Sequence, residues 1–319
     1  RITALAVSHQ DPSVWWAASA SGGLLKTTNN GASFEHQFDR ESTVSLGDVQ
    51  VAPSDHNIVW VGTGESNPRN SVSWGNGVYK SIDGGKTWKN MGLNKTFQIG
   101  RMAIHSKDPN IVYVGALGRL WGPNKERGLY KTTDGGKTWK QVLFVDDKTG
   151  VIDLQMHPAD PDILLAATYE RQRDGFDGND PMKKYGPGAG IYRTTDGGAT
   201  FKKITKGLPS GDLGRIGLSF FLKDPNHVYA VIESEDIGRL NDDFPYAGIQ
   251  GTDAEAGAKI TSVVKKGPAE QAGMKNGDIV IAINDGPIYA YSDLIESIRK
   301  HKAGDEVTWR IVRDHKGVE

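Results

Sequence analysis

The stretch Lys131-Thr-Thr-Asp-Gly-Gly-Lys-Thr-Trp139 decides the fold of this chain, because it returns with small changes at three other places. The copies begin at Lys26, Lys80 and Arg193, and their turn residues recur every 51 to 62 residues. In each copy an Asp or Asn is followed by glycine, which a tight hairpin needs for its positive φ angle. The Asp or Asn side chain can also accept hydrogen bonds from N–H groups of the turn. We therefore interpret four residues as hairpin-turn residues first, namely Asn29, Asp83, Asp134 and Asp196.

A second signature alternates with the first along the chain. It is an Asp-Pro pair before a short β-rich run such as Ile58-Val-Trp-Val61, and the second copy, Ser54-Asp55, lacks the proline. The other copies are Asp11-Pro12, Asp108-Pro109, Asp160-Pro161 and Asp224-Pro225. The pattern predicts a unit of strand, Asp-Pro turn, strand, variable loop, strand, Asp-Gly turn and strand. Four antiparallel strands in about 50 residues are typical of a propeller blade.

These repeats resemble the Asp-box (BNR) repeats of sortilin-like and sialidase-like β-propellers, whose motif is Ser/Thr-x-Asp-x-Gly-x-Thr-Trp/Phe. The resemblance covers residues 1–240 and implies four complete blades and the start of a fifth. The first copy departs from the motif at Asn29 and Ser33. In that family the Asp-box is a folding element, so the resemblance implies a structural role for Asn29, Asp83, Asp134 and Asp196.

Strand alternation places the two kinds of turn on one face of such a propeller and the variable loops on the other. These loops become longer along the chain, and the longest runs from residue 169 to 188. Long loops on a rigid scaffold are where binding usually occurs. The polar and aromatic candidates on this loop face are Glu65, Arg69, Trp74, Arg119, Trp121, Tyr169, Arg171 and Arg173. The alternative is that they are solvated loop residues with an occasional packed tryptophan.

Counting seven residues back from each Asp-Pro turn predicts matched positions on the inner strands. These positions are Ala4, Asp48, Arg101, Asp153 and Gly217. The three charges could form a ring that binds a polar ligand, or they could pair with one another as a structural network. We favour pairing.

From about Asn241 the Asp-box signatures stop and the composition changes to Ala- and Gly-rich segments with one clear helix. Residues 242–316 resemble PDZ domains of the bacterial type found in HtrA proteases. The resemblance rests on Tyr246-Ala-Gly-Ile249, Gly267-Pro-Ala-Glu-Gln-Ala-Gly-Met274 and Asn276-Gly-Asp-Ile279. We interpret residues 241–319 as a PDZ domain inserted in the loop of the fifth blade, in a mainly β chain with one α+β unit.

A PDZ domain adds an extended peptide to a sheet edge and holds the terminal carboxylate in a loop of backbone N–H groups. The resemblance assigns that loop to Tyr246, Ala247, Gly248 and Ile249. It also implies an apolar pocket lined by Ile249 with Leu294 or Ile298, on a helix for which Ser292 is the expected N-cap. The alternative is a PDZ domain that serves only as a spacer.

Composition excludes several kinds of function. The net charge is −1 with acidic and basic residues interspersed, whereas nucleic-acid binders usually show a clustered basic face. No stretch approaches the roughly 18 apolar residues of a membrane helix. The chain has no cysteine and no Gly-x-Ser-x-Gly nucleophile motif. We expect no nucleic-acid partner, no membrane span, no cofactor and no metal site.

The sequence therefore favours a non-enzymatic scaffold or receptor that binds a polypeptide C-terminus or extended segment. Its loop face and PDZ groove would hold one ligand at high effective concentration. The alternative is part of a larger secreted hydrolase, a glycosidase or protease, in which the PDZ domain tethers substrate. Because the fifth blade is unfinished, we expect further blades in a longer chain. The family resemblance implies a location outside the cytoplasm.

Overall fold

The structure is a computed structural model. It describes residues 1–67, 72–173, 183–235, 245–313 and 316–318. The chain divides into two compact units, Arg1–Asp236 and Ile237–Glu319. No helix in the described part of the chain is long and apolar enough to cross a membrane.

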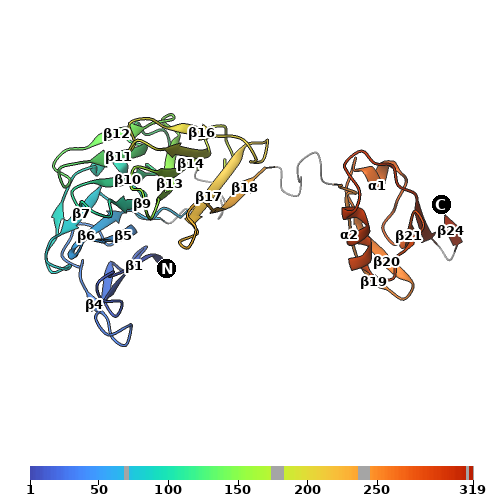
Figure 1. Ribbon diagram of the computed structural model, residues 1–319, viewed down its shortest axis with the longest axis horizontal. Helices are drawn as coiled ribbons and strands as arrows, with labels where there is room; N and C mark the ends of the chain where they lie inside the picture. Colours follow the sequence, from blue (N-terminus) through green and yellow to red (C-terminus); the bar gives the residue numbers. More distant parts are fainter. Residues whose placement is uncertain (68–71, 174–182, 236–244, 314–315, 319) are drawn as a thin grey trace. The chain divides into compact units, whose positions relative to one another are not determined.

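The first unit is a series of four-stranded antiparallel sheets, which Figure 1 shows one after another. In each complete blade the strands pair in chain order. Blade one consists of β1 Ile2–Val7, β2 Trp15–Ser19, β3 Leu24–Thr27 and β4 Glu35–His36. Blade two consists of β5 Leu46–Ala52, β6 Asp55–Thr63, β7 Val78–Ser81 and β8 Lys89–Asn90. Blade three consists of β9 Ile99–Ile104, β10 Val112–Ala116, β11 Gly128–Thr132 and β12 Lys140–Leu143. Blade four consists of β13 Thr149–Met156, β14 Leu164–Glu170, β15 Gly190–Thr194 and β16 Lys202–Ile204. The predicted order of strands and turns is confirmed.

The Asp-box turns form as the sequence predicts. Asp83 accepts hydrogen bonds from the N–H and the hydroxyl of Thr87, at 2.9 and 2.5 Å, and Gly84 and Gly85 both have positive φ angles. The N–H of Gly84 bonds the carbonyl of Asn57 at 3.0 Å, and so attaches the Asp-box turn to the first turn of the same blade. The turns of blades three and four repeat this bond at Gly135 and Gly197. Both kinds of turn therefore lie on one face, and the variable loops lie on the other.

Consecutive blades pack through an aromatic side chain on the second strand. Trp60 is fully buried and meets Trp139 of the next blade edge to face, with ring centroids 6.0 Å apart. Lys80 lies over Trp60, 5.3 Å from the ring centroid. Tyr113 occupies the same position one blade later and donates to the carbonyl of Gly197 at 2.8 Å. The apolar core of the propeller unit is therefore divided among the blade interfaces.

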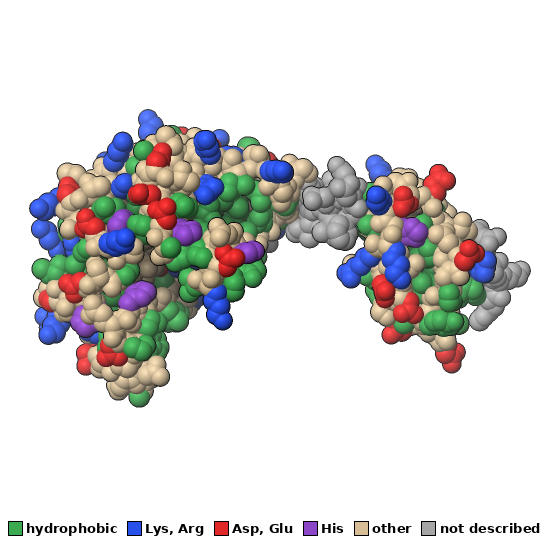
Figure 2. All heavy atoms as spheres, in the orientation of Figure 1, with side chains coloured by type: hydrophobic (Ala, Val, Ile, Leu, Met, Phe, Trp, Pro, Cys, Tyr) green, Lys and Arg blue, Asp and Glu red, His purple; other side chains and the backbone are tan. Residues whose placement is uncertain are grey.

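Among the described residues, blade five consists of β17 Leu213–Phe220 and β18 Val228–Ser234, which form a two-stranded sheet. Tyr229 and Val231 on β18 are 65% and 79% exposed, whereas the residues of the matching run in blade two, Trp60 to Gly62, are buried. Figure 2 shows hydrophobic side chains gathered on the surface over these two strands. This edge is apolar and exposed in the described structure.

In its described residues, the second unit is a small antiparallel sheet with two helices. The strands pair in the order β19, β20, β21, β23, β24, with β22 beside β21. A core cluster around Leu294, Ile260 and Val280 lies between the sheet and the second helix. The elements are β19 Ile249–Ala254, β20 Gly257–Val263, α1 Pro268–Gln271, β21 Ile279–Ile283, β22 Gly286–Pro287, α2 Tyr291–Arg299, β23 Trp309–Arg313 and β24 Lys316–Val318. The first unit also holds one 3-10 turn, Asn94–Thr96.

The residues that begin and end α1 are those the sequence predicts, whereas the start of α2 differs from the prediction. Pro268 opens α1, and Gly273 follows it with a φ of 83°. The prediction that Ser292 is the N-cap of α2 is wrong, because the N-cap is Ala290 and Ser292 lies inside the helix. The carboxylate of Asp293 instead accepts the N–H groups of Tyr289 and Ala290, at 3.1 and 3.0 Å. Asp293, at the third helical position, thus supplies the half of a capping box in which the side chain accepts the N–H of the cap residue.

Candidate functional site

In the loop before β19, the carbonyl groups of Ala247 and Gly248 are hydrogen-bonded, and the N–H groups of these two residues have no partner among the described residues. The carbonyl of Ala247 accepts the N–H of Ala269 on α1 at 3.0 Å, and that of Gly248 accepts the N–H of Val264 at 2.9 Å. Within the described part of the chain, the N–H groups of Ala247 and Gly248 donate no hydrogen bond. Gly248 has a φ of 73°, which a side chain would make costly. Consecutive free N–H groups in such a loop form a concave site for an anion.

The strand after this loop is the outermost strand of its sheet. β19 pairs only with β20 among the strands of that sheet, so its other edge carries backbone groups available to an added strand. Ile249 and Ile298 are half-buried, while Leu294, on the inner side of α2, is fully buried in the core. Of the two helix residues expected at an apolar pocket, Ile298 therefore remains nearer the surface. Tyr246 is 52% exposed at the entrance of the loop.

The start of α2 is attached to the same strand. The N–H of Tyr291 donates to the carboxylate of Asp253 at 2.7 Å. The ring of Tyr291 lies so close to Gly251 that a Cβ there would come within 2.6 Å of it. These contacts hold α2 at a set distance from β19, which is what a groove between a strand and a helix requires.

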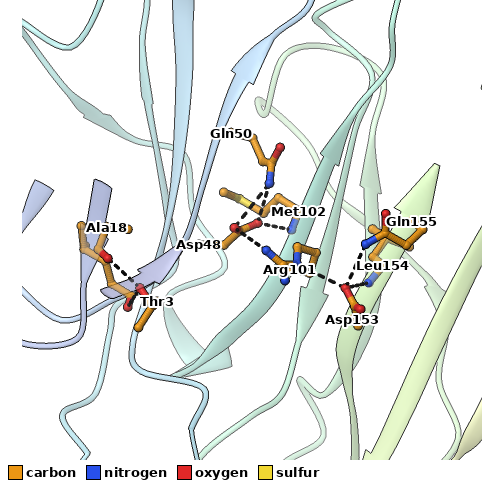
Figure 3. A network of polar contacts seen from close by, with 10 residues as sticks. Thr3, Ala18, Asp48, Gln50, Arg101, Met102, Asp153, Leu154 and Gln155 are labelled. Carbon is orange, nitrogen blue, oxygen red and sulfur yellow. Dashed lines mark hydrogen bonds and ion pairs between the residues drawn. The ribbon is translucent and has the colours of Figure 1, made fainter. Parts of the chain in front are cut away.

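On the inner strands of the propeller unit, Arg101 lies between two carboxylates (Figure 3). Its Nη1 is 3.3 Å from Oδ1 of Asp48, and its Nε is 3.2 Å from Oδ1 of Asp153. Both carboxylates follow a β-bulge, a device that redirects side chains. Burial raises the pKa of Asp48, and the charge of Asp48 raises the pKa of Arg101. The predicted pairing of these charges is present.

The second oxygen of each carboxylate holds the neighbouring blade. Oδ2 of Asp48 accepts the N–H of Met102 at 2.6 Å, and Oδ2 of Asp153 accepts the N–H of Leu218 at 2.7 Å. Ala4 and Gly217 lie at the matched positions of blades one and five. The carboxylates thus connect β5 to β9 and β13 to β17, which is a structural use of all three charges.

The loop-face candidates separate into exposed and buried residues. Trp74 is 54% exposed and meets Phe97 edge to face, and Arg119 bonds the carbonyl of Pro123 through two nitrogens. Trp121 is partly exposed, and Arg69 lies outside the described residues. The remaining candidates are less than a tenth exposed, so they are not the solvated loop residues of the alternative: Glu65, Tyr169, Arg171 and Arg173.

Sequence reasoning missed three buried polar residues near these loops. Arg127 is 1% exposed and donates to the carbonyls of Leu117, Arg119 and Gly122. Gln98 accepts from Arg171, and Glu170 pairs with Lys183 and accepts the N–H of Gly188. Polar residues within or beside loops give no periodic signal of burial, so sequence alone offered little to find them.

Comparison with known proteins supports both units. The family model for the PDZ domain matches residues 245–319. A xyloglucanase of Acetivibrio thermocellus is 27% identical over 198 residues, which is 57% of this chain and 22% of that protein. A probable periplasmic DegP-like serine endoprotease of Chlamydia trachomatis is 28% identical over 126 residues, 36% of this chain and 25% of its own. This chain therefore spans about a quarter of the length of these relatives.

A solved structure extends the likeness in fold. The family 74 xyloglucanase of Xanthomonas campestris superposes with a TM-score of 0.55 at 15% identity, over 78% of this chain and 39% of the other. At that identity the likeness shows a shared propeller fold. The model described as sortilin, neurotensin receptor 3, matches residues 76–236, which is half of the chain. Together with the Asp-box turns and the blades, this match shows that the chain belongs to the Sortilin-Vps10 family and carries a PDZ domain in its second unit.

Proposed function

We propose that this chain is a polypeptide-binding protein whose PDZ domain holds a free C-terminus. The observation that carries the proposal is the loop at Ala247 and Gly248, where the carbonyls bond inward and the N–H groups are left without partners among the described residues. A terminal carboxylate supplies two oxygens for such donors, and charge-assisted hydrogen bonds are stronger than neutral ones. The loop therefore favours a chain end over an internal segment.

The rest of the ligand would bind by strand addition. The free edge of β19 would pair with the backbone of an extended peptide, and pairing fixes which side chains point toward α2. The half-buried Ile249 and Ile298 flank this route, so the last side chain of the ligand would be apolar. Peptides that end in Leu, Ile, Val or Phe are the expected ligands.

The test is fluorescence anisotropy of labelled peptides that end in an apolar residue, titrated with the full chain. Gly248→Glu should abolish binding, because it places a negative charge beside the carboxylate site. Gly304→Glu is the matched control, since Gly304 also has a positive φ, of 92°, and a Cβ there would meet open space. We expect saturable binding by the unchanged chain and by Gly304→Glu.

Amidated peptides separate recognition of a terminus from binding along a strand. Loss of binding on amidation supports carboxylate recognition, whereas equal binding of amidated and free peptides would contradict it. If no peptide binds the folded chain, the PDZ domain is a spacer and the proposal fails.

A second candidate function follows from the relatives. The chain matches a xyloglucanase over 57% of its length and a periplasmic protease over 36%, so it is a candidate binding portion of a larger extracytoplasmic hydrolase in which the PDZ domain tethers substrate. We assign no catalytic group to the residues described here. Incubation of the chain with xyloglucan and with casein should release no product, and turnover of either would place catalysis within it.

A further inference from the structure

Two of the buried guanidinium groups in the propeller unit, those of Arg127 and Arg171, are not used by the proposed PDZ function. Arg127 and Arg171 are each 1% exposed. Arg171 donates to the carbonyl of Ser66 at 3.3 Å and to Oε1 of Gln98 at 2.6 Å. Arg127 donates only to backbone carbonyls. Every acceptor of the two groups among the described residues is neutral.

The two groups therefore lack a bonded counter-charge in the described part of the chain. Asp146 and Asp147 act on Arg127 through space, but neither bonds it. Burial lowers the pKa of Arg171 to about 9 and that of Arg127 to about 10. The Nε atoms of both residues are buried without a hydrogen-bond partner. Buried charge of this kind is costly unless something negative pairs with it.

Both groups line the same cavity, whose volume is about 210 Å³. Four of its described lining side chains are cationic, and none of the described ones is acidic: Arg127, Lys148, Arg171 and Arg173, with Gly122, Pro123 and Gln172. Lys148 is exposed. The cavity is smaller than the roughly 300 Å³ at which sites for drug-sized ligands begin, so it suits a small group.

We propose that this cavity binds a compact tetrahedral oxyanion, a phosphate or sulfate group, either free or at the end of an ester. Guanidinium groups present forked donors that match such oxygens. With Lys148 and two buried arginines around it, the cavity suits a dianion better than a single carboxylate, which would leave more positive charge uncompensated.

Isothermal titration calorimetry with inorganic phosphate and sulfate tests this directly, with acetate as the monoanion and all solutions at matched ionic strength. Methyl phosphate forms the ester arm: binding equal to that of phosphate indicates an ester end group, and its exclusion indicates the free ion. The unchanged chain should bind phosphate or sulfate at least tenfold more tightly than acetate.

Variants locate the site. Lys148→Glu should weaken binding by about tenfold, because the charge reversal sits at the cavity. Lys140→Glu, an exposed lysine on β12 outside the cavity lining, should leave binding unchanged. Gly248→Glu should also leave it unchanged, which separates this site from the carboxylate loop of the PDZ domain.

Arg171→Met provides a second measurement through thermal unfolding. The unchanged chain should melt at a higher temperature as phosphate is added, and the variant should show no such rise. The proposal would be overturned if phosphate and sulfate gave no heat of binding and raised the melting temperature no more than chloride does. Equal weakening by Lys148→Glu and Lys140→Glu would also overturn it, because it would indicate nonspecific attraction.

Discussion

At the scale of single residues, the Asp-box shows how one carboxylate organises a turn. In the turns of blades two, three and four, one Asp oxygen accepts a backbone N–H and the other accepts a threonine hydroxyl. In blade one, Asn29 accepts the N–H of Ser33 at 2.9 Å and donates its own amide to the Ser33 hydroxyl. A neutral side chain can therefore form the turn. Only a carboxylate makes the stability of the turn depend on pH.

This difference predicts the behaviour of Asp83→Asn in acid. Hydrogen bonds from Thr87 lower the pKa of Asp83 from 3.8 to about 2. Because the pKa is lower in the folded chain, the carboxylate contributes stability above pH 3.8 that is lost as the pH falls toward about 2. The difference in unfolding free energy between the unchanged chain and Asp83→Asn should therefore shrink across that window.

Urea unfolding followed by tryptophan fluorescence measures this difference at each pH. Asp285→Asn, which removes the carboxylate of an exposed turn residue in the other unit, is the control. A difference that stays constant between these pH values would show that the Asp83 charge contributes nothing.

At the scale of elements, the inner strands are joined by the charges around Arg101. Arg101 on β9 reaches Asp48 on β5 and Asp153 on β13, so one side chain links three blades. Asp48 is fully buried, and the arginine is 36% exposed. Removing one partner of a buried pair leaves the other charge uncompensated, which costs more than the pair itself contributes.

Arg101→Met should therefore destabilise the propeller unit by roughly 3 kcal/mol at pH 7, near the low end for buried pairs because the arginine is partly exposed. Burial already raises the pKa of Asp48, and the loss of Arg101 removes an attraction that lowers it. A carboxyl group with a raised pKa binds its proton more readily when folded, so the variant should regain stability as the pH falls from 7 to 5.

Urea unfolding at the two pH values checks this prediction. Arg193→Met, the same change at an exposed position on β15, is the control and should have little effect. A variant whose stability falls further at pH 5 would contradict the role assigned to Asp48.

At the scale of the whole molecule, the exposed edge at β18 breaks the pattern of the other blades. Tyr229 lies where Trp16, Trp60 and Tyr113 lie in blades one to three, and each of those is covered by the Asp-box turn of the next blade. An exposed apolar strand edge is a template for association. We propose that a further Asp-box blade covers this edge.

With Tyr229 and Val231 exposed on β18, the chain should self-associate through this edge as its concentration rises. Val231→Lys should reduce the fraction of larger species in sedimentation velocity, because a charged side chain on an edge strand blocks pairing. Ile82→Lys is the matched control, since Ile82 is 71% exposed but lies in an Asp-box turn. If both variants reduce association equally, β18 is not the contact.

The sequence alone determined the repeat, the position of the turns, the family resemblances of both units and the alignment of Asp48, Arg101 and Asp153, because each depends on residues close in the chain or on a regular period. Asp83 needs only Thr87, four residues away, to form its turn. Only the tertiary structure decided that Arg171 and Arg127 are buried around one cavity and that Leu294 belongs to the core. It also decided that the N–H groups of Ala247 and Gly248 have no partner among the described residues. These depend on contacts such as that of Arg171 with Ser66, which join loops of different blades. Such contacts follow no period, so no local pattern carries them.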